Sequence, residues 1–99
     1  MKKFDAHLLS FSDAEEQGNA IEYFFDGPES WCSKEFPELK VHSTTICITE
    51  DVDKEITASY SPCVYNDEEE AYIDIEWQDF DISKEDADYL INLAANDML

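Results

Sequence analysis

The clearest alternation of apolar and polar side chains in this chain falls over residues 71–77. Its apolar positions are Ala71, Ile73, Ile75 and Trp77. This alternation predicts a half-buried β-strand. Because successive residues of a strand point to opposite faces of the sheet, we expect Tyr72, Asp74 and Glu76 to lie together on the solvent face.

Two further strands are predicted before this one. Residues 41–49 are rich in β-branched side chains, which strands favour, and residues 56–65 resume the same pattern. Pro62 indicates an edge position or a bulge in the second of these strands. The links over residues 50–54 and 66–70 are short and polar, as in antiparallel hairpins.

A first helix is predicted over about residues 13–25. Ala14, Gly18, Ile21 and Phe25 recur at helical spacing. The segment from Ser12 to Glu15 resembles a capping box, in which the serine hydroxyl and the glutamate satisfy free amides. The sequence 26–28, Asp-Gly-Pro, would end this helix.

A second helix is predicted from near Ser83 to about Asp97. Ser83 is a good N-cap residue with Asp86 three positions later. The expected buried stripe consists of Ala87, Leu90, Ile91, Ala94 and Met98, with Leu93 alongside it. Residues 4–11 are either a short edge strand or an irregular lead-in, and residues 27–38 form a loop that Trp31 and Phe36 pin to the core.

These elements predict a single α+β domain over residues 1–99. The expected fold is an antiparallel sheet of three to four strands with two helices packed on one face. Its order is α-β-β-β-α, with an extra N-terminal strand as an open alternative. The composition excludes disorder, because 43% of the residues are apolar, 13% are aromatic and only 2 are glycine.

The charge of the chain is unusual for a small globular domain. It has 25 Asp and Glu residues against 6 lysines and no arginine, a net charge of −19. A net charge of magnitude roughly 2–8 keeps a small domain soluble, and larger values destabilise the compact state through self-repulsion. We therefore expect a basic protein partner, such as a nucleic-acid-binding protein or a nuclease, and neither direct nucleic-acid binding nor membrane docking.

The acidic residues concentrate in the second half of the chain, and residues 67–88 hold 11 of them. Alternate residues of a strand lie roughly 6.6 Å apart, comparable to the spacing of successive phosphates, so this stretch could present a ladder of charge that resembles a nucleic-acid backbone. The alternative is an ordinary solvated face. The candidate partner-binding residues are Asp67, Glu68, Glu69, Glu70, Tyr72, Asp74, Glu76, Asp79, Asp81, Glu85 and Asp88.

Other chemistry has weaker support in the sequence. Cys32, Cys47 and Cys63 are an odd, widely spaced set, typical of reduced thiols in part buried in a core. Paired aspartates such as Asp51 and Asp53 lack the twelve-residue calcium loop, and the cysteines and histidines lack zinc-ligand spacing. We expect no cofactor, no metal and no enzymatic activity. Without a secretory signal or a bilayer-spanning segment, the expected location is the cytoplasm, that of a bacterial host if a phage encodes the chain.

In composition and size the chain resembles DNA-mimic inhibitors, small acidic proteins that phages and mobile elements use against CRISPR complexes, restriction enzymes or other DNA-binding proteins. This resemblance implies an inhibitor that occupies a basic nucleic-acid-binding surface. The alternative is an immunity protein or antitoxin that neutralises a cationic nuclease toxin. A halophilic domain, whose acids serve solvation, is a third hypothesis. The oligomeric state stays open.

Overall fold

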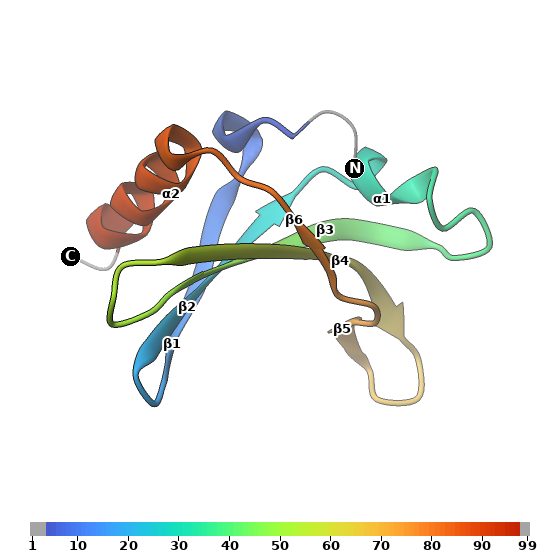
Figure 1. Cartoon of the computed structure of the whole chain (residues 1–99). Helices are drawn as coiled ribbons and strands as arrows, with labels where there is room; N and C mark the ends of the chain where they lie inside the picture. Colours follow the sequence, from blue (N-terminus) through green and yellow to red (C-terminus); the bar gives the residue numbers. More distant parts are fainter. Residues whose placement is uncertain (1–3, 98–99) are drawn as a thin grey trace.

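A strongly curled antiparallel sheet forms most of this protein, and the computed structural model describes residues 4–97 (Figure 1). The sheet order is β1-β2-β3-β4-β5, and β6 also pairs with β4. The strands are β1 (Ser10–Gln17), β2 (Ala20–Gly27), β3 (Val41–Glu50), β4 (Ile56–Asn66), β5 (Ala71–Asp74) and β6 (Gln78–Phe80). All the pairings are antiparallel.

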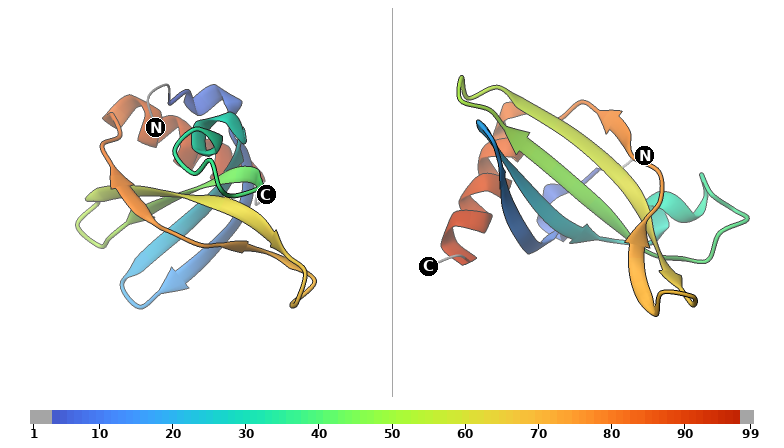
Figure 2. Two further views of the ribbon diagram at one scale, coloured as in Figure 1. Left: turned by 90° about the vertical axis from the view of Figure 1, so that its right-hand side faces the viewer. Right: turned by 90° about the horizontal axis from the view of Figure 1, so that it is seen from below.

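Three helical segments lie on one side of this sheet (Figures 1 and 2). They are the 3-10 turn η1 (Ala6–Leu8), the short helix α1 (Ser30–Ser33) and the long helix α2 (Lys84–Asp97). We name the side of the sheet that they cover the first face, and the opposite side the second face.

The core lies between the first face and these helical segments. Its four largest fully buried side chains are Phe25 from β2, Ile46 and Ile48 from β3, and Leu90 from α2. Burying each such side chain stabilises the fold by roughly 1.5–3 kcal/mol. The core therefore packs α2 on the sheet, where its closest backbone neighbours are η1 and the edge strand β1.

The predicted fold of two helices on a three- to four-stranded sheet is wrong, because residues 13–25 form a hairpin instead of a helix. Ile21, Tyr23 and Phe25 all face the core, at the two-residue period of a strand. Gln17 pairs with Ala20, which leaves a two-residue loop. Gly18 begins this loop with a φ of +62°, the conformation that a type II′ hairpin turn requires at its first loop position.

The second predicted helix is confirmed as α2. The Ser83 hydroxyl oxygen accepts a hydrogen bond from the Asp86 amide at 3.1 Å, as an N-cap does. The buried side chains of this helix are Ala87, Leu90 and Ala94, with Ile91 and Leu93 packed at the edge of the core. Met98, the last residue of the predicted stripe, lies outside the described residues.

The strands predicted over residues 41–49 and 56–65 are confirmed as β3 and β4. The loop over residues 27–38 contains α1, and it is pinned as predicted, with Phe36 buried and Trp31 half-buried. Residues 4–9 form the irregular lead-in, which contains η1, and only Ser10 and Phe11 of the range 4–11 belong to the edge strand β1.

The predicted strand over residues 71–77 is interrupted opposite Pro62. Cys63 pairs with Asp74 and Tyr60 pairs with Gln78, so three residues, 75–77, face only two residues of β4. Such an extra residue is a β-bulge. Pro62 has no N–H to offer the neighbouring strand, and this explains why regular pairing stops here. The bulge indicated by Pro62 thus lies in the partner segment, whereas β4 itself is a central strand.

Candidate partner-binding surface

All the carboxylates of the chain lie at the surface. The 25 Asp and Glu residues fall within residues 4–97, and 21 of them are exposed. The other four, Glu22, Glu50, Asp51 and Asp86, are half-buried. Lys84 pairs with Asp88 at 2.7 Å and Lys54 with Glu50 at 4.0 Å. Exposed pairs of this kind contribute about 0–1 kcal/mol, so they compensate little of the negative field.

The turn between β4 and β5 carries the densest group of candidate residues. The side-chain oxygen of Asn66 accepts hydrogen bonds from the amides of Glu68 and Glu69, at 2.9 and 3.3 Å. Glu70 closes the turn with a φ of +54°. Asn66 thus caps two amides of the turn, and the four carboxylates of Asp67, Glu68, Glu69 and Glu70 are exposed at the tip of the hairpin.

The bulge separates two residues that the sequence places on one face. The Asp74 carboxylate lies on the second face, where it accepts a hydrogen bond from the Thr45 hydroxyl. Burial raises the pKa of Tyr60 on the core side, and the charge of Glu76 is among those that raise it further. The ring of the next residue, Trp77, packs against Phe24, which pairs with Cys47 on the second face. Because successive residues of an extended segment point to opposite sides, Glu76 lies towards the first face. The predicted ladder of Tyr72, Asp74 and Glu76 is broken after Asp74.

The remaining candidate residues divide between the two sides of the sheet. Asp79 on β6 pairs with Ser59, at a position that shares the second face with Asp74. Asp81 lies in the link that leads from β6 to α2, and Glu85 and Asp88 are exposed on α2. Since α2 packs on the first face, the 11 candidate residues do not form one continuous surface.

Two acids on β2 belong to the second face and were missed from the sequence. Glu22 accepts a hydrogen bond from the Cys47 thiol at 3.7 Å, and Asp26 pairs across to Thr45. The helix predicted over residues 13–25 concealed them. The alternation of Ile21, Tyr23 and Phe25 was the signal that would have placed both acids on the same face.

These charges surround a buried thiol on the second face. Burial raises the pKa of Cys47 to about 11, and the neighbouring carboxylates of Glu22 and Asp74 raise it as well. Burial also raises the pKa of Cys63, with Asp74 contributing. Both thiols are free and stay protonated at neutral pH, so neither is an activated nucleophile.

Three aromatic rings meet at the β4–β5 end of the second face. The ring centroids of Tyr65 and Tyr72 lie 5.1 Å apart in an edge-to-face arrangement, and those of His42 and Tyr72 lie 4.3 Å apart. Tyr65 is 47% exposed and Tyr72 is 56% exposed. Tyr72 was predicted as a contact residue, whereas His42 and Tyr65 were not.

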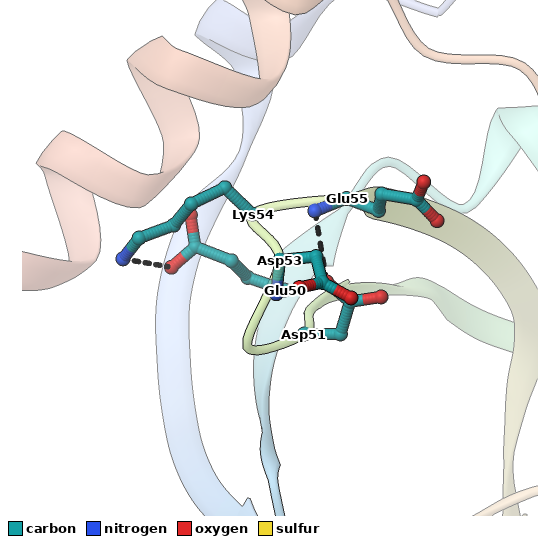
Figure 3. Close-up of polar contacts among 5 residues, drawn as sticks. All are labelled: Glu50, Asp51, Asp53, Lys54 and Glu55. Atoms are coloured by element: carbon teal, nitrogen blue, oxygen red, sulfur yellow. Dashed lines mark hydrogen bonds and ion pairs between the residues drawn. The ribbon is translucent and has the colours of Figure 1, made fainter.

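The turn between β3 and β4, at the other end of the sheet, uses an acid for its own structure. The Asp51 carboxylate accepts hydrogen bonds from the amides of Asp53 and Glu55, both at 2.9 Å (Figure 3). Lys54 has a φ of +65°. Asp51 is thus a turn-capping residue, whereas the side chains of Asp53 and Glu55 point into solvent.

The described residues hold no metal-binding arrangement. Within residues 4–97, no three side chains of His, Cys, Asp or Glu come together in a way that would hold a metal ion. No helix in the same range combines the length and the apolar character needed to cross a membrane.

Comparisons with known proteins identify no relative. No protein-family model matches the chain, and no curated protein or solved structure matches it at a significant level. A proposal about its function therefore rests on the surface chemistry of the chain.

Proposed function

We propose that this chain is an acidic inhibitor of the DNA-mimic type, which occupies the basic nucleic-acid-binding surface of a target protein or complex in the cytoplasm. One observation carries this proposal: none of the 25 acidic residues is buried, and the chain has no arginine to pair with them. A field of this strength attracts basic surfaces and speeds their encounter.

The shape of the sheet gives this field a direction. The β1–β2 and β4–β5 hairpins both project to the side of the sheet away from α2 (Figure 1). Glu15 and Glu16 lie beside the loop of the first hairpin, and the 67–70 turn forms the tip of the second. Asp26 and Asp74 lie on the second face between them. This arrangement supports the second face and its two hairpins as the partner-binding side.

The candidate residues divide accordingly. We propose direct contacts for those of the β4–β5 hairpin and the second face, namely Asp67, Glu68, Glu69, Glu70, Tyr72, Asp74 and Asp79. Glu76, Asp81, Glu85 and Asp88 lie towards the other layer, so their proposed role is to strengthen the long-range field. Such a field acts over about 8–10 Å at physiological salt.

Affinity capture followed by a displacement assay tests this function. The full chain is immobilised on a resin and incubated with a lysate of its source cells. Proteins that elute only at high salt are then identified by mass spectrometry. The purified target is then titrated with the chain while its binding to labelled DNA or RNA is followed by fluorescence anisotropy. Stoichiometric release of the nucleic acid, weakening as salt rises, is the expected result.

Two outcomes contradict the proposal or redirect it. A target that keeps its nucleic acid at saturating concentrations of the chain excludes mimicry. If the target is a cationic nuclease toxin encoded beside this chain, the chain is an immunity protein that uses the same surface.

A further inference from the structure

The exposed aromatic rings at the end of the β4–β5 hairpin do not belong to the hydrophobic core, so packing of the core does not account for them. We name His42, Tyr65 and Tyr72 the Tyr72 cluster. The two tyrosines are about half-exposed and His42 is exposed, although their rings contact one another. Exposed aromatic side chains of this kind are typical of partner-binding surfaces.

The sheet holds these rings in a fixed arrangement. Tyr65 and Tyr72 are directly paired across β4 and β5, so their side chains lie on the same face. His42 sits where the register of β3 shifts between Val41 and Ser43, and its ring lies against Tyr72. Because tyrosine has few rotatable bonds, rings that are already positioned lose little entropy when a partner binds.

The charge around the cluster indicates what would bind it. The 67–70 turn, with four exposed carboxylates, connects the strands that carry Tyr65 and Tyr72. Asp74 lies two residues beyond Tyr72 on the same face. Aromatic rings beside carboxylates suit a cation that can stack on a ring and donate hydrogen bonds at its edge. A second copy of this chain is disfavoured because each copy carries a net charge of −19.

We propose that the Tyr72 cluster and the carboxylates of the 67–70 turn bind an arginine side chain of the basic partner. The guanidinium group stacks on the tyrosine rings while its N–H groups donate to the carboxylates. Lysine offers a compact, strongly hydrated charge without a planar face, so the cluster favours arginine over lysine. This inference rests on the proposed function, since it assumes that the partner is basic.

Nona-arginine and nona-lysine peptides test this preference on the full chain. Their affinities are measured by isothermal titration calorimetry at 50 and 150 mM NaCl. We expect nona-arginine to bind more tightly, and Tyr72→Leu to weaken it by about two- to thirty-fold, the range that the strength of a cation–π interaction implies. The affinity for nona-lysine should change less than two-fold, and Tyr72→Phe should keep the preference because it keeps the ring.

Tyr89→Leu is the matched control. Tyr89 on α2 is also exposed and also lies against a histidine, with its ring centroid 4.4 Å from that of His7. It should leave both affinities unchanged. Thermal melts by circular dichroism verify that each variant folds.

The arginine anchor is overturned if Tyr72→Leu weakens both peptides equally, if Tyr89→Leu has the same effect, or if wild type shows no arginine preference. Each of these results would leave the proposed function standing. The displacement assay on the captured target tests that function separately, so the two proposals can fail independently.

Discussion

The Asp74 carboxylate on β5 accepts a 2.5 Å hydrogen bond from the Thr45 hydroxyl on β3, across the second face of the intervening strand β4. Thr45 is only 7% exposed, so its hydroxyl has little access to water. Asp74 is thus both a candidate contact residue and a structural one. Any substitution there will change stability as well as binding.

Asp74→Ala should lower the free energy of unfolding by about 1–2 kcal/mol, because it leaves a buried hydroxyl without its acceptor. Urea denaturation measures this loss. Thr45→Val combined with Asp74→Ala should be clearly less destabilising than the sum of the two single changes. Strict additivity would contradict the bond, and Asp79→Ala on the same face should cost less than about 0.5 kcal/mol.

Charge reversal at each end of the sheet tests which end contacts the target. Glu68→Lys combined with Glu69→Lys, at the tip of the β4–β5 hairpin, should weaken binding to the captured target. Breaking one ion pair with a buried arginine or lysine costs about 2–5 kcal/mol, much of it from leaving the partner's charge unpaired. Surface plasmon resonance measures the affinity together with the association and dissociation rates.

The matched control for this variant is Asp53→Lys combined with Glu55→Lys. These two exposed acids lie in the β3–β4 turn (Figure 3), at the opposite end of the sheet from the β4–β5 hairpin (Figure 1). The two substitutions change the net charge by the same amount. This control should slow association slightly and leave dissociation unchanged. Equal losses of affinity from both variants would show that net charge, and not the β4–β5 hairpin, determines affinity.

Ionic strength should stabilise the fold itself. Like charges such as Glu15 and Glu22, which are directly paired across β1 and β2, repel one another, and salt screens this repulsion. We expect the melting temperature to rise between 10 and 300 mM NaCl, at about 4–8 °C per kcal/mol gained. Circular dichroism measures it. A chain that is unfolded in dilute buffer and folds only in molar salt would instead support the halophilic hypothesis.

Alkaline pH should destabilise the chain through Cys47. Burial foremost raises the pKa of its thiol from 9.0 to about 11 in the folded state. The folded chain therefore holds this proton more tightly than the unfolded chain does. The stabilisation is fully present below about pH 9 and is lost as pH rises towards 11, on the order of 2–3 kcal/mol in total.

Urea unfolding of wild type and Cys47→Ser between pH 7 and 10.5 measures this loss. The stability of wild type should fall relative to that of the variant, because serine does not ionise in this range. A constant difference between the two proteins would contradict the raised pKa. Alkylation by iodoacetamide at pH 8 gives a second measurement, in which native Cys47 should react about 100-fold more slowly than in urea.

The sequence pattern was most informative where one periodicity was unambiguous. Helix α2 has a serine cap and a clear apolar stripe, and β3 and β4 are rich in β-branched residues, so these elements could be predicted. Residues 13–25 fit two periods at once. Ala14, Gly18, Ile21 and Phe25 recur at helical spacing, whereas only Ile21, Tyr23 and Phe25 follow the two-residue period of a strand. Tertiary packing stabilises the strand, because it buries these three side chains against the core.

The candidate surface was predictable in composition but not in geometry. Most of the acidic residues are exposed and none is buried, as their type implies. Their faces depend on a bulge opposite Pro62, and sequence alternation does not show which of two paired strands takes up the extra residue. The contact of His42 with Tyr72 was not predictable for the same reason, because it depends on a register shift in β3 that sequence alternation does not show.

A single substitution at Gly18 distinguishes the hairpin from the helix by the sign of its effect. In a helix, Gly18→Ala would stabilise the chain by about 1 kcal/mol. In the hairpin, Gly18 has a φ of +62°, and an added Cβ would meet no atom within 4 Å. The backbone conformation alone therefore sets the cost, about 1–2 kcal/mol for a residue other than glycine. We expect urea denaturation to show this loss for Gly18→Ala and a smaller one for Gly18→Asn, since asparagine tolerates positive φ. A gain in stability from alanine would mean that residues 13–25 are helical after all, and would remove Glu22 and Asp26 from the second face.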